Sequence, residues 1–316
     1  MAAHASEVSR FTTMYLDQWV WIRLARARLS RFEAIPSRIR DQLVSARLQG
    51  TAAFPLSEAH YLETWKQGKL RRRSELAVEM GLLSGFLTLA PMRNIWPQEL
   101  DQALHERFGR PQVMASPPVF GHGVSFAFGQ SDVQPNVTSL DLEQRFLFEW
   151  EVLRSPDESR FSVDDHERRS KAARFADIET TESWKLKSWP VSDQERAQRF
   201  RVQTLTNLDV DFYGRLIAAD ISPEELGALG GEGLEALVRA VPTLWVLTEL
   251  RRLRYANPSQ GFKPSDLYDL RALAVAIVYC DVVIADRAWV HVLQGSDLPE
   301  RYGTVVAAKL EHVLEA

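Results

Sequence analysis

Two apolar runs of the chain end directly in an aspartate: residues 14–16 precede Asp17, and residues 282–285 precede Asp286. If both runs are strands of one parallel sheet, the two carboxylates lie at its carboxyl edge, where ligands of such sheets bind. Neighbouring buried carboxylates repel each other unless a cation lies between them, and oxygen-only ligands suit Mg²⁺ or Mn²⁺. The pattern predicts a divalent-cation site, although Asp17 alone is equally consistent with a helix N-cap.

Acidic residues of two predicted helices are candidates for the same site. Glu58 and Glu63 follow Ser57, the expected cap of a helix, and lie about 140° apart around its axis, so they do not both point into one site. In a helix predicted over residues 265–278, Asp266 and Asp269 share a face at i, i+3. Asp266 is interpreted as a first-turn acid that complements the helix dipole. Asp269 precedes small alanines that allow close packing on a sheet.

The elements that must position these acids follow a strand–helix alternation. The β-favouring runs Thr12–Leu16, 51–54 and 282–285 are separated by predicted helices, and strands separated by helices indicate a parallel sheet. The first and last regions of the chain are therefore expected to share one sheet. The fold class predicted is α/β, with a small parallel sheet flanked by helices and a large helical insertion.

The middle of the chain is predicted to be this helical insertion or cap. It contains helical periodicity over residues 140–153 and 192–219, and a glycine-rich loop at 117–129 in which His122 is interpreted as a turn residue. The predicted division is 1–96 for the N-terminal half of the core, 97–242 for the insertion, and 243–316 for the C-terminal half of the core.

In the order and spacing of its acids, the chain resembles the PIN-domain family of metal-dependent ribonucleases. Tyr-Leu-Asp17 resembles the end of that family's first strand, and Glu63, six residues after Ser57, its helical glutamate. Asp269-Leu-Arg-Ala-Leu-Ala resembles the aspartate that opens an alanine-rich helix, and Val-Val-Ile-Ala-Asp286 the aspartate after the next strand. The resemblance covers roughly residues 12–90 and 243–316. The chain departs from it in its long middle region, and the glutamate assignment stays open between Glu63 and Glu58.

The resemblance implies a metal-dependent endoribonuclease of the PIN-like fold and, by analogy with the family, a toxin or defence effector. Mg²⁺ or Mn²⁺ would be held by Asp17, Glu63, Asp269 and Asp286, with Glu58, Asp266 and Asp281 as additional acids. RNA is the implied substrate, and its backbone would be positioned by basic residues. The candidates are Lys66, Lys69, Arg71, Arg72, Arg73, Arg251 and Arg254.

Composition limits the other possibilities. The 316 residues carry 38 basic and 42 acidic side chains, hence a formal charge of −4, so bulk charge alone does not bind nucleic acid. The single cysteine, Cys280, excludes an intrachain disulfide and a cysteine-based zinc site. The N-terminus lacks the apolar segment of a signal peptide, and the longest apolar stretches, 80–92 and 272–280, are too short to cross a bilayer. These features predict a cytoplasmic protein without a membrane segment.

Two other functions remain open. The first is a PIN-like binding or scaffold protein without catalysis, against which the presence of all four acids argues. The second is a nuclease or phosphatase that acts on DNA or on nucleotides. A haloacid-type phosphatase is disfavoured because Trp19 stands where such enzymes have a second aspartate. The sequence has no Gly-x-x-x-x-Gly-Lys phosphate loop, and it names neither a protein inhibitor nor an oligomeric state.

Overall fold

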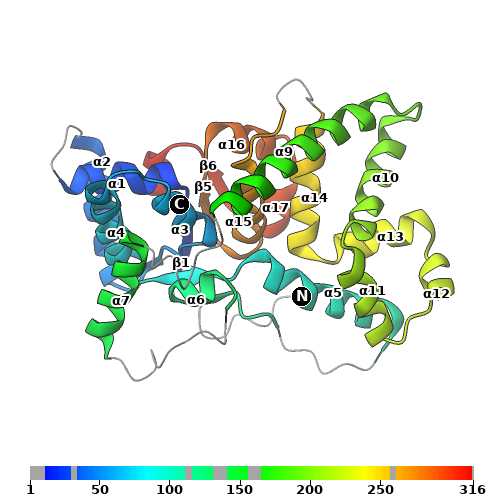
Figure 1. Ribbon diagram of the computed structural model, residues 1–316, viewed down its shortest axis with the longest axis horizontal. Coiled ribbons are helices and arrows are strands. Elements are labelled where there is room, and N and C mark those ends of the chain that lie inside the picture. The colour runs from blue at the N-terminus through cyan, green and yellow to red at the C-terminus, as the bar shows by residue number, and fades with distance from the viewer. Residues whose placement is uncertain are drawn as a thin grey trace. The chain divides into compact units, whose positions relative to one another are not determined.

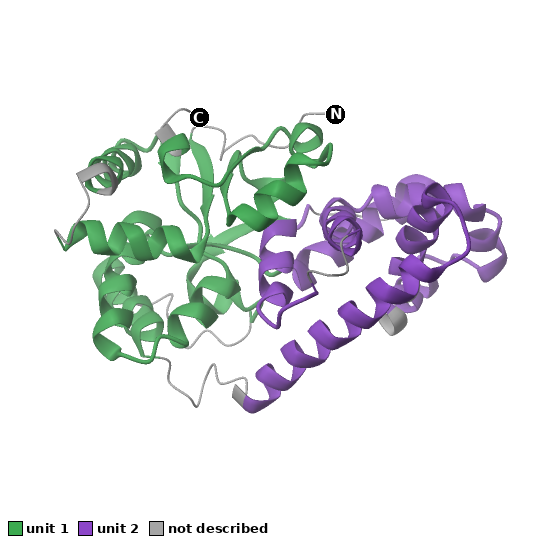
Figure 2. Cartoon of the chain, turned by 90° about the horizontal axis from the view of Figure 1, so that it is seen from above, with its two compact units in different colours: residues 1–91, 119–163, 275–316 green, residues 92–118, 164–274 purple. Residues whose placement is uncertain are grey.

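The computed structural model of the protein describes residues 11–29, 34–110, 116–130, 141–155, 165–256 and 261–314. The chain forms two compact units, shown in green and purple in Figure 2. Unit 1 comprises residues 1–91, 119–163 and 275–316, and unit 2 comprises residues 92–118 and 164–274. No helix in the described ranges is both long and apolar enough to cross a membrane.

Unit 1 is built on a four-stranded parallel sheet in the order β2-β1-β5-β6 (Figure 1). The strands are β1 (Thr12–Leu16), β2 (Ala52–Ala53), β5 (Val282–Ile284) and β6 (Val305–Ala307). Leu16 pairs with Ile284, and Ile284 pairs with Ala307, so β1, β5 and β6 end at the same level. The structure thus confirms the small parallel sheet shared by the first and last regions of the chain.

The core of unit 1 includes apolar side chains of the sheet and of the helix that follows β1. Leu16, Val20, Trp21 and Leu24 have no more than trace exposure, as do the β5 residues Val283 and Ile284. Burial of these side chains is the main favourable contribution to folding of the unit. The helices are α1 (Gln18–Arg28), α2 (Ala34–Leu48), α3 (Glu58–Trp65), α4 (Leu70–Ser84), α6 (Gly123–Ala127), α7 (Leu142–Arg154), α16 (Arg287–Gln294), α17 (Leu298–Tyr302) and the 3₁₀ helix η3 (Leu310–Leu314).

The segment predicted to be a loop at 117–129 is ordered into regular structure. β4 (Phe120–His122) pairs antiparallel with β3 (Leu87–Leu89), and α6 follows it directly. Gly123 adopts a φ of 84°, and a Cβ at this position would overlap the carboxylate of Glu149, which accepts a hydrogen bond from the Val124 N–H at 2.9 Å. The glycines that indicated a loop therefore allow a close approach between two packed elements.

Unit 2 is helical and holds several ion pairs away from solvent. Arg251 forms two 2.8 Å hydrogen bonds to Glu179, whose carboxylate also accepts the Tyr255 hydroxyl at 2.6 Å. Arg201 pairs with Glu249 and Glu235, each at 2.7 Å. The helices are α5 (Met92–Phe108), α9 (Asp165–Ser188), α10 (Asp193–Thr206), α11 (Asp209–Ala218), α12 (Pro223–Gly227), α13 (Gly230–Arg239), α14 (Pro242–Tyr255) and the first part of α15 (Asp266–Tyr279).

The division into units differs from the predicted one in three segments. Residues 92–96, assigned from the sequence to the N-terminal half of the core, are part of unit 2. Residues 119–163, assigned from the sequence to the insertion, cluster with the sheet, because β4, α6 and α7 pack on elements of unit 1. Residues 243–274, assigned to the core, cluster with the helices of unit 2. The boundary falls inside α15, so one helix belongs to both units.

Candidate acidic site at the carboxyl edge of the sheet

Asp17 and Asp286 follow the adjacent central strands β1 and β5, and the backbone joins them. The N–H of Asp17 donates to the carbonyl of Ile284 at 2.9 Å. One carboxylate oxygen of Asp17 accepts the N–H of Asp286 at 3.1 Å. The strand order reverses between β1 and β5, since β2 lies on one side of β1 and β5 and β6 on the other. The two aspartates therefore lie at the topological switch point, where open parallel sheets bind ligands.

The helix α3 is anchored to the end of β1 by a buried histidine. His60 accepts the Ser57 N–H on Nδ1 at 2.9 Å, so its Nε2 carries the proton and donates to the Leu16 carbonyl at 2.7 Å. Burial lowers the pKa of His60 from 6.5 to about 4, so the ring is neutral at pH 7. Leu16 directly precedes Asp17, and the bond therefore holds α3 beside the first acid.

A second contact reinforces this anchor one turn further along α3. The amide Nε2 of Gln18, the residue after Asp17, donates to Thr64 Oγ1 at 3.1 Å. Thr64 adjoins Glu63 in the chain, and Gln18 and Thr64 are both buried. The bonds from His60 and Gln18 place Glu63 over the carboxyl end of β1. His60 and Gln18 were not identified from the sequence. For His60, the available signal is the Ser-x-x-His spacing, in which His60 takes the Glu/Gln place of a capping box.

Two acids of the site have raised pKa values, because they are poorly solvated and lie near another carboxylate. Burial and the charge of Asp286 raise the pKa of Asp17 from 3.8 to about 6, and nearby backbone N–H groups offset part of this rise. Burial and the charge of Asp17 raise the pKa of Glu63 from 4.5 to about 7, and Lys66 opposes the increase. Asp17, Glu63 and Asp286 thus form one electrostatically coupled group.

The remaining predicted acids lie elsewhere or belong to another part of the chain. Glu58 is in the first turn of α3, and Asp269 is in the part of α15 that belongs to unit 2. Asp266 accepts the Lys263 N–H at 2.9 Å and lies 3.7 Å from a guanidinium nitrogen of Arg254. Asp281 accepts the Thr13 N–H and hydroxyl, both at 2.6 Å, at the amino ends of β1 and β5. Asp266 thus lies in the first turn of α15, as interpreted from the sequence, and of the two roles open for Asp281, structural turn acid or outer partner of the site, these bonds favour the structural one.

The predicted RNA-binding arginines divide into buried and exposed groups. Arg251 and Arg254 are paired with Glu179 and Asp266 inside unit 2, so their charges are not available to a phosphate and this prediction is corrected. Arg73 donates to the Gln67 and Arg154 carbonyls, and Arg71 pairs with Glu75 on the same helix. Exposed positions near the start of α4 are occupied by Lys66, Lys69 and Arg72.

The acidic group fits a divalent cation in donor type and in electrostatics. Its oxygens are those that Mg²⁺ and Mn²⁺ prefer, and a cation between them would offset the burial and the mutual repulsion that raise both pKa values. The buried Gln18 Oε1 next to Asp17 has no hydrogen-bond partner among the described residues, and an ion or its bound water at the site would satisfy it. Within the described ranges, no three His, Cys, Asp or Glu side chains are already arranged around a metal position.

Comparison with known proteins adds no relative: no family model, no curated protein and no solved structure matches this chain.

Proposed function

We propose that the protein is a metal-dependent endoribonuclease with a PIN-like core, whose site is formed by Asp17, Glu63 and Asp286 of unit 1. The observation that supports this most strongly is the pair of aspartates at the carboxyl ends of β1 and β5, coupled to a helical glutamate that is anchored above them. The order of these acids along the chain is that of the family it resembles. The buried Cys280 and the absence of a disulfide suit a reducing, cytoplasmic setting.

The protein's part of the reaction is to hold charge and to exchange protons. When bound, Mg²⁺ or Mn²⁺ supplies polarisation of the phosphodiester and a lowered pKa for an attacking water. The carboxylates of Asp17 and Glu63 have pKa values of about 6 and 7, so they are poised to lose their protons near neutral pH as a cation is taken up. Asp286 remains fixed because its side chain also caps α16 through the Trp289 N–H at 2.9 Å.

A cleavage assay with matched variants tests the proposal. Structured and single-stranded RNAs are incubated with wild-type protein and with Asp17→Asn, Asp286→Asn or Glu63→Gln, in Mg²⁺ or Mn²⁺. Loss of an outer-shell partner of a metal costs roughly 10–100-fold, so loss of a ligand is expected to reduce cleavage by about 100-fold or more.

Glu58→Gln is the matched control for this assay, because it removes a carboxylate from the same helix five residues earlier. It should retain activity, and this comparison also resolves the choice between Glu58 and Glu63. Normal cleavage by both Asp17→Asn and Asp286→Asn would refute the proposed ligand set. If only a DNA or nucleotide substrate is hydrolysed, the site stands and the RNA assignment fails.

A further inference from the structure

A pocket opens beside the acidic group, on the side of β5 and β6. Its volume is about 650 Å³, within the range of roughly 300–1,000 Å³ typical of small-molecule sites. Its lining comes from α1, from the start of α16 and from the segment after β6, which are the chain segments that follow three adjacent strands of the sheet. The lining residues are Trp19, Arg23, Asp286, Arg287, Ala308, Lys309, Glu311 and His312.

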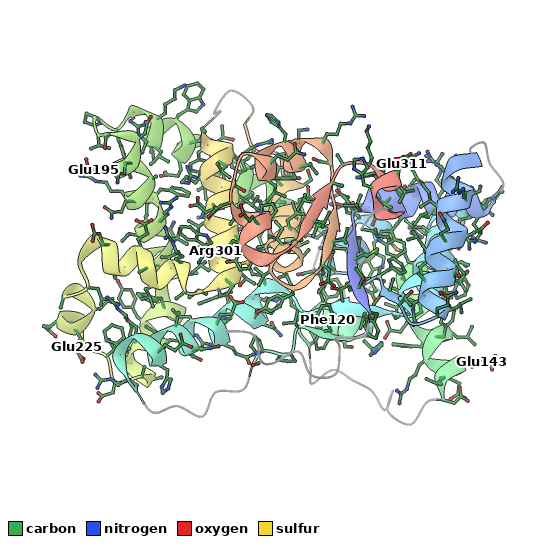
Figure 3. All side chains as sticks on the ribbon, turned by 180° about the vertical axis from the view of Figure 1, so that it is seen from behind. Phe120, Glu143, Glu195, Glu225, Arg301 and Glu311 are labelled. Atoms are coloured by element: carbon green, nitrogen blue, oxygen red, sulfur yellow. The ribbon has the colours of Figure 1, made fainter. Side chains whose placement is uncertain are left out.

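The pocket adjoins the acidic group through Asp286, which belongs to both. Asp286 contributes to the lining, and its N–H is bonded to the carboxylate of Asp17. The opposite wall comes from η3, on which Figure 3 labels Glu311 beside the blue helices of the N-terminal region, and α2 packs against η3. A ligand in this pocket would therefore lie next to the carboxylates.

The pocket concentrates positive charge in a chain whose net charge is −4. Three permanent cations, Arg23, Arg287 and Lys309, face two carboxylates, Asp286 and Glu311. Arg287 and Lys309 are exposed and form no ion pair with another described residue. Their charges are therefore available to an anionic ligand, unlike those of the buried arginines of unit 2.

One wall of the pocket is aromatic. Trp19 is half-buried, and the Arg23 guanidinium lies 5.9 Å from the centre of its ring. Aromatic side chains together with cations are the usual combination for binding single-stranded nucleic acid, because the ring stacks on a base and the cations contact the phosphate. A free inorganic anion has no base that could stack on the Trp19 ring.

We propose that this pocket binds one nucleotide of a single-stranded RNA, with its phosphate at Arg287 and Lys309 and its base against Trp19. This inference rests on the proposed function, because the pocket would hold the nucleotide next to the phosphodiester that is cleaved. The cations that offset the acidic site would then be Arg287, which follows β5, and Lys309, which follows β6, and not the basic residues near the start of α4.

Binding measured without metal tests the pocket separately from catalysis. Adenosine 5′-monophosphate, adenosine and inorganic phosphate are titrated into the full-length protein in the presence of a chelator, and binding is followed by NMR. We expect the monophosphate to bind more tightly than either fragment. Arg287→Gln combined with Lys309→Gln should weaken its binding by about tenfold or more, because two charge-assisted contacts are lost. Trp19→Leu should weaken the binding of the monophosphate but leave the binding of inorganic phosphate unchanged.

Arg26→Gln is the control for these variants, since it removes an exposed cation from the same helix as Arg23 that does not line the pocket. Its binding should equal that of wild type. An equal loss in Arg26→Gln, no effect of the double substitution, or no binding of the monophosphate would each overturn the proposal. RNA cleavage without nucleotide binding would leave the nuclease standing and remove only the pocket. Nucleotide binding without cleavage would do the reverse.

Discussion

Asp17 and Asp286 each follow a strand and precede a helix, yet their carboxylates have different roles. Asp286 caps α16 through the Trp289 N–H, as expected of an aspartate at this position. Asp17 also occupies the N-cap position of its helix, and the backbone N–H groups of Gln18 and Trp19 oppose the rise of its pKa. Its carboxylate, however, makes no cap hydrogen bond and accepts the N–H of Asp286. The N-cap interpretation made for Asp17 is therefore met in position but not by a cap bond, and the burial of this carboxylate costs solvation, which is compatible with a binding role.

The charge on Asp17 is expected to destabilise the metal-free protein at neutral pH. Because folding raises its pKa from 3.8 to about 6, the folded state binds more protons than the unfolded state between these values. The stability due to this proton is complete below the lower value and is lost as pH rises through the upper one. Asp17→Asn removes the charge, and should raise the free energy of unfolding at pH 7 by on the order of 1–3 kcal/mol.

Urea denaturation from pH 4 to 8, in chelator, measures this effect. The wild type should lose stability across the window from about 4 to 7 that Asp17 and Glu63 define, and Asp17→Asn should flatten the lower part of it. A variant that is less stable than wild type at pH 7 would show that the Asp17 carboxylate is a structural acceptor and not a strained ligand.

At the scale of elements, α3 and β1 form one fixed corner. The neutral ring of His60 bridges the Ser57 N–H and the Leu16 carbonyl, and Gln18 bonds Thr64 on the same helix. Both bridges are buried, so neither is easily replaced by water. The His60 bridge reaches backbone atoms at both ends, and the Gln18–Thr64 bond joins two side chains. Together they hold Glu63 in relation to Asp17 more rigidly than a contact between the two acids alone.

Replacing this bridge should loosen the corner. His60→Phe keeps a ring of similar size but leaves the Leu16 carbonyl and the Ser57 N–H unpaired in the core. We expect the free energy of unfolding to fall by on the order of 2 kcal/mol or more, since each buried unsatisfied group costs about 1–3 kcal/mol. Chemical denaturation measures the change, and Glu58→Gln, on the surface of the same helix, should show almost none. Equal stability of His60→Phe and wild type would mean that the corner is held by packing alone.

At the scale of the whole molecule, the helical unit and the sheet-based unit use charge differently. Unit 2 neutralises its buried charges internally, as in the Arg251–Glu179 and Arg201–Glu249 pairs. Unit 1 keeps two acids with raised pKa values at the edge of its sheet. Charges paired as in unit 2 are not available to a ligand, whereas a bound cation would stabilise the arrangement in unit 1.

Mn²⁺ should therefore raise the melting temperature of the full protein. A ligand at 100 times its dissociation constant adds about 2.7 kcal/mol to the stability of the folded state. The increase should diminish as the pH falls from 7 to 5, because protons compete with the cation for Asp17 and Glu63. A thermal shift series at several Mn²⁺ concentrations measures it, and the combined Asp17→Asn and Asp286→Asn variant should not respond. A similar shift in that variant would place the cation elsewhere.

Local patterns were sufficient to predict several elements of this protein. The β-branched run 282–285, the strand Thr12–Leu16 and the Ser57 cap depend on short-range preferences and on burial periodicity, and all appear in the structure. β6 and the β3–β4 pair were missed, because these short strands lack a run of β-branched residues as long as that before Asp286 and depend more on their pairing partners. Local patterns also could not predict the division into units, since that division depends on which helices pack together.

For the candidate site, the sequence by itself determined that a carboxylate follows each of two apolar strands. It thereby determined that negative charge would lie at the carboxyl edge of the sheet. Only the tertiary structure decided that Glu63 is coupled to Asp17, that Asp281 and Asp266 are occupied by structural bonds, and that Arg251 and Arg254 are paired inside unit 2. The physical reason is that a residue's type sets the charge it can carry, whereas burial and partners distant in sequence set whether that charge is free to act.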